Sequence, residues 1–124
     1  MIISTFLNRQ RLGNQLFIYA SLLGIAKKNN TCVNEVIKIN HWIKDGNRSF
    51  IIDRDVPLIE IKEDAFNYTP IVFSNNSIDY DLQGYFQSYK YFDNIPKFEF
   101  KQEYTDKADK ILSFIPYKKK IAIH

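Results

Sequence analysis

The order of hydrophobic and polar positions predicts a short strand followed by a long buried helix at the start of the chain. Residues 1–7 form a β-rich apolar run, which is consistent with a buried parallel strand. Over residues 15–28, apolar side chains recur at helical spacing on one face and cover most of the remaining surface. Because a helix that is apolar almost all round is buried between layers, this pattern favours a doubly wound α/β domain.

The turn between this strand and this helix has the residue types of a ligand-binding loop. Gly13 permits a tight turn or a close backbone approach. Asn14 can cap the helix by accepting a hydrogen bond from an amide of the first turn. The free amides and the positive helix end favour an anionic or oxygen-rich ligand in front of the loop. Such turns are common, so this pattern alone names no function.

The rest of the chain predicts more strands and two further helices. Short apolar runs of extended character lie at 31–33, 50–52, 56–61, 71–73 and 82–86. Residues 88–93 are expected to form a short helix, and residues 100–115 have the spacing of an amphipathic surface helix. Residues 121–123 are expected to form a strand parallel to residues 2–5, with His124 at its carboxyl end.

Two carboxylates at Asp79 and Asp81 form an Asp-x-Asp sequence that is similar to some metal-binding sequences. Metal-binding pairs of this kind usually follow an apolar strand, whereas this pair follows a polar turn. His41 has no companion histidine, cysteine or acidic pair at ligand spacing, so it is expected to be packed or solvated. No metal site is therefore expected.

Composition and charge narrow the class of protein. A chain of 124 residues that is 45% hydrophobic and 15% aromatic suits one globular domain. The net charge of +3 could assist binding to a nucleotide diphosphate or an anionic membrane surface, but on its own it does not indicate binding to nucleic acid. The single cysteine, Cys32, excludes an internal disulfide and fits a reducing compartment, and its apolar neighbour Val33 predicts a buried, inert thiol.

The chain also lacks the sequence patterns of membrane insertion and secretion. No apolar run approaches the ~18 residues of a membrane span. Met1 leads directly into the predicted strand, without the pattern of a secretory signal. We therefore expect a cytoplasmic location, with at most peripheral contact at the inner face of the membrane.

Two sequence blocks resemble those of a known enzyme family. Residues 12–20 (Leu-Gly-Asn-Gln-Leu-Phe-Ile-Tyr-Ala) resemble the N-terminal signature of the α-1,2-fucosyltransferases, glycosyltransferase family eleven. Residues 82–92 resemble the mid-domain sequence Gly-Tyr-Phe-Gln-Ser-x-Lys-Tyr-Phe of the same family. Two blocks in the right order are more specific than either alone. The chain departs from the family at Arg11, where many members have glycine, and at Ile18, which replaces a glutamine.

The resemblance implies an α/β fold, the N-terminal Rossmann-like half of a GT-B glycosyltransferase, with a parallel sheet and flanking helices. It implies transfer of fucose from GDP-fucose to a galactose hydroxyl of a glycan acceptor, in α-1,2 linkage, without a metal or other cofactor. Residues 1–124 would then be a single N-terminal domain truncated at the start of the donor-binding strand and loop, without the C-terminal domain. An arginine-containing block of the family would follow His124, so the fragment alone is expected to be inactive.

The resemblance also assigns expected site residues. The expected donor-binding residues are Gly13, Asn14, Gln15 and His124. The expected acceptor-cleft residues are Tyr85, Gln87 and Lys90, because they lie at the carboxyl end of the strand predicted over 82–86, where open α/β sheets bind ligands. Their neighbours Tyr89, Tyr91 and Phe92 are expected to pack. The catalytic residues stay unknown, because Asp79, Asp81 and Glu60 are all open as the base.

Two other functions are compatible with the sequence. One is a protein O-fucosyltransferase, or another fucosyl-transfer relative that shares the Gly-Asn-Gln loop, although the second block favours the first family. The other is a non-catalytic α/β ligand-binding module. In the enzyme interpretations the partners are a nucleotide-sugar donor and a glycan acceptor, with no nucleic acid.

Overall fold

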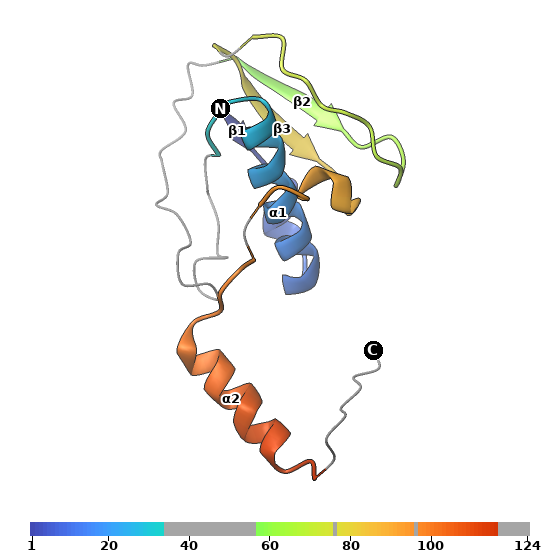
Figure 1. Ribbon diagram of the computed structural model, residues 1–124. Helices are drawn as coiled ribbons and strands as arrows, with labels where there is room; N and C mark the ends of the chain where they lie inside the picture. Colours follow the sequence, from blue (N-terminus) through green and yellow to red (C-terminus); the bar gives the residue numbers. More distant parts are fainter. Residues whose placement is uncertain (34–56, 76, 96, 117–124) are drawn as a thin grey trace.

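A small parallel sheet forms the centre of the computed structural model, which describes residues 1–33, 57–75, 77–95 and 97–116. Its strands are β1 (Ile2–Ile3), β2 (Leu58–Lys62) and β3 (Asp79–Gln83), in the spatial order β1-β3-β2 (Figure 1). Both outer strands pair in parallel with the central β3. The expected α/β class is therefore confirmed.

The first strand is shorter than the predicted run over residues 1–7, because polar groups end it. The Ser4 hydroxyl donates to the Leu82 carbonyl (2.7 Å) and accepts from the Leu7 amide (3.3 Å). The Thr5 amide leaves the sheet to donate to Asp81 Oδ1 (2.9 Å). The chain then reverses through the 3₁₀ helix η1 (Phe6–Arg9).

Helix α1 (Leu12–Lys28) begins earlier than predicted, which corrects the roles expected of Gly13 and Asn14. Arg11 is the N-cap residue, and its side chain makes no capping hydrogen bond with any described residue. Asn14 lies inside the first turn, so its predicted capping role is wrong. Gly13 is also helical, and no described atom outside its own turn of helix lies within 4 Å of the position of a Cβ there, so the predicted tight turn is wrong. The reversal is made by η1 instead.

The body of α1 is buried on most sides, as its apolar pattern predicts. Its buried residues are Ile18, Tyr19, Ala20, Ser21, Leu22, Gly24, Ile25 and Ala26. Its members in the hydrophobic core are joined there by Ile2 of β1 and Leu82 of β3; they are Ile18, Tyr19, Leu22, Ile25 and Ala26. At Gly24 the helix meets the segment 82–92 so closely that a Cβ would lie 1.9 Å from the Tyr91 carbonyl oxygen.

The segment after α1 is less regular than the strand predicted for residues 31–33. It forms an isolated parallel bridge between Val33 and Ile2, in which the Ile2 amide donates to the Cys32 carbonyl (2.9 Å). Cys32 is exposed, so the buried thiol expected from its apolar neighbour is wrong. In an extended segment, successive side chains point in opposite directions, and Val33 is the half-buried one.

Two predicted extended runs differ in their outcome. Residues 56–61 give rise to β2, with its bounds shifted by a residue or two. Residues 71–73 form no strand. The Phe73 amide donates to Asn29 Oδ1 (2.8 Å), and the Phe73 ring stacks on Tyr80 with centroids 4.1 Å apart. Residues 50–52, like His41, lie outside the described residues.

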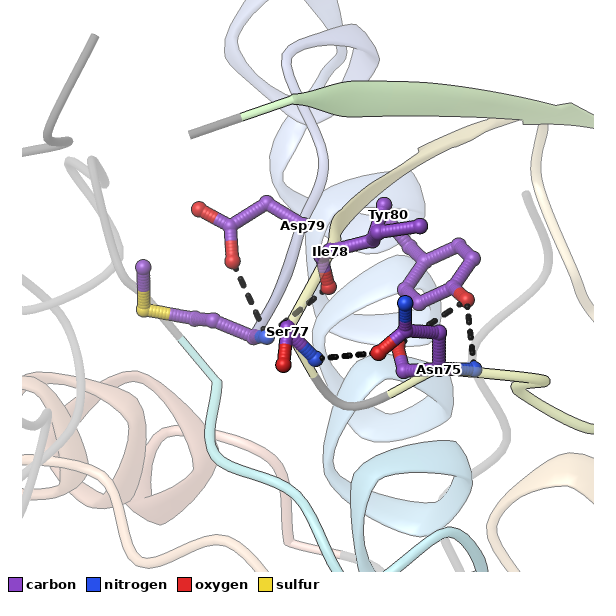
Figure 2. A network of polar contacts seen from close by, with 6 residues as sticks. Asn75, Ser77, Ile78, Asp79 and Tyr80 are labelled. Atoms are coloured by element: carbon purple, nitrogen blue, oxygen red, sulfur yellow. Dashed lines mark hydrogen bonds and ion pairs between the residues drawn. The ribbon is translucent and has the colours of Figure 1, made fainter. Parts of the chain in front are cut away.

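The central strand β3 occupies 79–83 instead of the predicted 82–86, so Asp79 and Asp81 lie within the strand itself. Both carboxylates are buried. Asp79 Oδ1 lies 3.0 Å from the N-terminal amine of Met1, which also donates to the Ile78 carbonyl (3.5 Å; Figure 2). The same figure includes the Asn75 amide donating to the Tyr80 hydroxyl (3.3 Å). These contacts hold the start of β3.

The C-terminal part of the described chain contains two helices. The helix expected over 88–93 is the short 3₁₀ helix η3 (Tyr89–Tyr91). Helix α2 (Gln102–Ser113) confirms the predicted amphipathic helix, but none of its residues is buried by the described part of the chain. It lies apart from the sheet and α1 (Figure 1). Residues 121–123 and His124 lie outside the described residues, so the strand expected there stays a prediction.

Candidate functional site

The carboxyl edge of the sheet gathers the residues of the candidate site. Because all three strands are parallel, their carboxyl ends meet at one edge, which is where open α/β sheets bind ligands. Thr5 follows β1, Glu63 follows β2, and residues 84–87 follow β3. Three segments far apart in the chain therefore meet here.

The loop after β3 has an unusual backbone. Gly84 has a φ of 155°. Phe86 has a φ of 46°, and a phenylalanine rarely adopts this left-handed conformation. A Cβ at Gly84 would lie 2.4 Å from the Cβ of Glu63. Glycine is therefore required at this close approach.

Two side chains hold this strained loop. The Glu63 carboxylate accepts hydrogen bonds from the successive amides of Tyr85 (2.7 Å) and Phe86 (3.0 Å). The buried Ser21 hydroxyl of α1 donates to the Phe86 carbonyl (2.6 Å). These contacts offset the cost of the left-handed residue, which is about 1–3 kcal/mol.

Among the expected site residues, Asn14 and Gln87 are brought into contact. The Gln87 Nε2 donates to Asn14 Oδ1 (3.2 Å), which joins the first turn of α1 to the loop after β3. Gln15 turns back instead, and its Nε2 donates to the Gln10 carbonyl (2.8 Å). The Tyr85 ring packs edge-on against Phe6, with centroids 5.2 Å apart.

Lys90 has a different environment from the one expected of a residue lining a cleft with Gln87. Its ammonium lies 5.7 Å from the centroid of the Tyr68 ring, and the ammonium of Lys28 lies 5.8 Å from the same centroid. Lys28 also pairs with Asp93 at 2.9 Å. Two cations therefore share one aromatic ring.

The three aromatic residues expected to pack behave differently. Tyr91 is buried and Phe92 is half-buried, as expected. Tyr89 is 67% exposed, so its expected packing is wrong. A single turn of 3₁₀ helix buries one side of the segment, and Tyr89 points away from it.

A cavity of about 290 Å³ opens beside Glu63. Its lining includes Glu63, Asn67, Thr69, Phe86 and Tyr91. The expected acceptor-cleft residues Tyr85, Gln87 and Lys90 do not line it, although their neighbours Phe86 and Tyr91 do. Sequence reasoning missed Glu63, and the available signal was its position two residues after the strand predicted over 56–61.

A second hollow, of about 490 Å³, lies along α1. Its lining is mostly apolar and consists of Gly13, Leu16, Phe17, Ala20, Phe92, Ile95, Lys97 and Phe98. Gly13 therefore faces this hollow, whereas Asn14 contacts Gln87. The expected donor-binding residues Gly13, Asn14 and Gln15 thus face three different surroundings, and His124 lies outside the described residues.

The three open candidates for a catalytic base are not equally available. The Asp81 carboxylate accepts hydrogen bonds from both the hydroxyl (2.7 Å) and the backbone amide of Thr5. The Asp79 carboxylate pairs with the N-terminal amine of Met1. Glu60 is exposed on β2, with its carboxylate 3.8 Å from the Lys62 ammonium. No cluster of three potential metal-ligating side chains occurs among the described residues.

Tyr91 is a buried titratable group in the lining of the cavity beside Glu63. Burial raises the pKa of Tyr91 above its ordinary value, and the nearby charge of Glu63 acts in the same direction. The Thr69 amide donates to the Tyr91 hydroxyl (3.0 Å) and acts in the opposite direction on its pKa. Tyr91 is therefore held as a neutral phenol at the wall of the cavity.

Comparison with known proteins identifies no relative: no protein-family model, no curated protein and no solved structure matches this chain. The likeness to the α-1,2-fucosyltransferases therefore rests on the two sequence blocks. Over the part of the chain that the structure describes, no helix has the length and apolar character needed to cross a membrane.

Proposed function

We propose that the chain is the N-terminal part of an α-1,2-fucosyltransferase-like enzyme, which transfers fucose from GDP-fucose to a galactose hydroxyl. The observation that carries this proposal is the hydrogen bond between Asn14 and Gln87 at 3.2 Å. Each residue belongs to one of the two blocks that resemble this family, and the blocks meet at the carboxyl edge of a parallel sheet. The proposed architecture is the Rossmann-like half of a GT-B enzyme.

In the proposed reaction, the N-terminal half of the enzyme helps to stabilise the negative charge on the departing GDP. In a site without a metal, this task falls to arginine side chains and helix N-termini. Gly13 and Asn14 lie in the first turn of α1, before the first intrahelical bond from the Gln15 amide to the Arg11 carbonyl (2.9 Å). Their amides therefore have no partner within the helix. The arginine-containing block is proposed to follow His124.

The test combines the gene with a transfer assay. Reading past His124 is expected to give an in-frame Arg-Arg-x-Asp sequence, and the full product is expected to fucosylate lactose from GDP-fucose in α-1,2 linkage. Asn14→Ala and Gln87→Ala should each lower the rate, and the double variant should lose little more. Gln102→Ala on the exposed helix α2 is the matched control. A folded full product that transfers no fucose would contradict the proposal.

A further inference from the structure

We infer that the cavity beside Glu63 binds one ring of a neutral saccharide. Its role as the acceptor subsite rests on the proposed function, whereas saccharide binding itself rests on the chemistry of the cavity. The cavity measures about 290 Å³ and lies at the carboxyl edge of β2 and β3. Small-molecule sites run from about 300 to 1,000 Å³, so this one suits a single ring.

The cavity offers acceptors that are fixed in place before a ligand arrives. Each oxygen of the Glu63 carboxylate accepts one backbone amide, from Tyr85 or Phe86. A carboxylate oxygen has two lone-pair sites, so each oxygen keeps one for a ligand hydroxyl. Bonds from hydroxyls to carboxylates are charge-assisted and short, and a carboxylate that is already held loses little freedom on binding.

The other walls suit the remaining surface of a sugar ring. Asn67 and Thr69 are exposed and line the same cavity, where they offer an amide and a hydroxyl. The buried residues Phe86 and Tyr91 also belong to the lining, and their rings pack edge-on with centroids 5.5 Å apart. A sugar presents hydroxyls at its rim and C–H groups on its faces, so it needs such a mixed lining.

Charge argues against an anionic ligand. The charged residues of the lining are Lys62, Glu63 and Asp64, which sum to one negative charge at neutral pH. The ammonium of Lys62 lies 3.8 Å from the Glu60 carboxylate. A phosphate or nucleotide would meet net repulsion here, whereas a neutral polyol would not.

The strained loop supports a binding role over a purely structural one. Phe86 is buried and keeps its left-handed backbone because its amide donates to Glu63 and its carbonyl accepts from Ser21. Such residues persist where the surroundings over-determine them, and they cluster at ligand sites. Glu63, whose carboxylate fixes the loop, also lines the cavity, so one residue belongs both to the strained loop and to the site.

The experiment is an NMR titration of ¹⁵N-labelled chain with methyl β-galactoside, and separately with GDP and inorganic phosphate. The saccharide is expected to shift the amide signals of Glu63, Thr69 and Phe86 in a saturable way, whereas GDP and phosphate leave them unchanged. Saturable shifts from GDP or phosphate at these residues, or no saccharide shifts there, would overturn the inference.

Two variants sharpen the test. Thr69→Val removes the hydroxyl and keeps the backbone amide that donates to Tyr91, and it should weaken saccharide affinity about fivefold, as expected for one lost hydrogen bond. Thr105→Val on α2 is the matched control and should leave the affinity unchanged. Glu63→Gln should abolish binding, and its folding is checked from the same spectra. Unchanged affinity in folded Thr69→Val would contradict the inference.

The two proposals fail in different experiments. Saccharide binding at Glu63 by a protein that transfers no fucose supports the inference and contradicts the proposed function. Fucosyl transfer by a full product whose Glu63 cavity binds no galactoside supports the proposed function and contradicts the inference.

Discussion

Gly13 and Gly24 belong to the same helix and have opposite surroundings. A Cβ at Gly24 would lie 1.9 Å from the carbonyl oxygen of Tyr91 and 2.9 Å from the Cα of Phe92. These are backbone atoms, which cannot move aside without displacing η3. At Gly13 no described atom outside its own turn of helix lies within 4 Å of the same position. Of these two positions, only Gly24 requires glycine for packing.

Gly24→Ala should therefore destabilise the protein, by about 1–3 kcal/mol, because overpacking exceeds the gain in helix propensity. Gly13→Ala should raise the free energy of unfolding by about 0.5–1 kcal/mol, since alanine favours the helix. Urea denaturation of both variants, followed by circular dichroism, measures the two changes. Equal effects of the two substitutions would contradict the close contact between α1 and η3.

Tyr91 makes stability depend on pH in alkaline solution. Its pKa is raised chiefly by burial, so the folded protein holds the phenolic proton more tightly than the unfolded chain. The corresponding stabilisation is fully present below the ordinary tyrosine pKa of about 10 and is lost as pH rises through the raised value. Unfolding free energies measured across this range should fall with pH. Tyr91→Phe should flatten that slope, whereas Tyr89→Phe, at an exposed phenol, should not.

At the scale of elements, Asn29 connects the end of α1 to the segment after β2. Its Nδ2 donates to the Ile25 carbonyl (2.9 Å) and the Ile71 carbonyl (2.9 Å). Its Oδ1 accepts from the Phe73 amide (2.8 Å). One side chain thus ends the helix and orders a segment more than 40 residues later.

Asn29→Ala should lower the free energy of unfolding by about 1–3 kcal/mol, because it leaves backbone groups of both segments without this partner. Asn30→Gly is the control, since Asn30 has a φ of 50° that glycine adopts without strain. Thermal unfolding followed by circular dichroism compares the two variants. A loss of stability in Asn30→Gly as large as in Asn29→Ala would show that helix termination, not the connection, matters.

Elements with a strong local pattern could be predicted from the sequence, whereas their ends could not. The apolar surface of α1, the amphipathic α2 and the run that becomes β2 all depend on local spacing. The start of β3 depends on Asp79 and Asp81, which are buried through contacts with Met1 and Thr5 at the other end of the sequence. Local patterns carry no information on such distant partners.

In the candidate site, too, some residues could be predicted from the sequence and others could not. Asn14 and Gln87 are recognisable because each belongs to a sequence block, and they form a hydrogen bond across the site. Glu63 belongs to no block, and its role follows from two distant backbone amides. The cap expected at Asn14 was wrong because the 3₁₀ turn η1 shifts the start of α1 to Leu12.

At the scale of the whole molecule, burial is concentrated in the sheet and α1. Leu22 is fully buried in the core cluster, whereas Ile111 of α2 is 65% exposed. Leu22→Ala should cost about 2–5 kcal/mol through lost burial and the cavity it leaves. Ile111→Ala should change stability by no more than about 0.5 kcal/mol. Chemical denaturation of both variants checks the contrast, and a large effect at Ile111 would indicate packing of α2 that the described residues lack.

The separate position of α2 also sets how fast the two helices exchange their amide hydrogens with solvent. Amides of α1 can exchange only when the core opens, whereas α2 can fray without disturbing the sheet. In a hydrogen–deuterium exchange experiment, the amides of residues 18–26 should therefore exchange far more slowly than those of residues 102–113. Mild denaturant should accelerate exchange in α1 and leave α2 nearly unaffected, because only the opening of α1 exposes new surface. The molecule would thus lose its structure in two stages, with α2 unwinding long before the sheet.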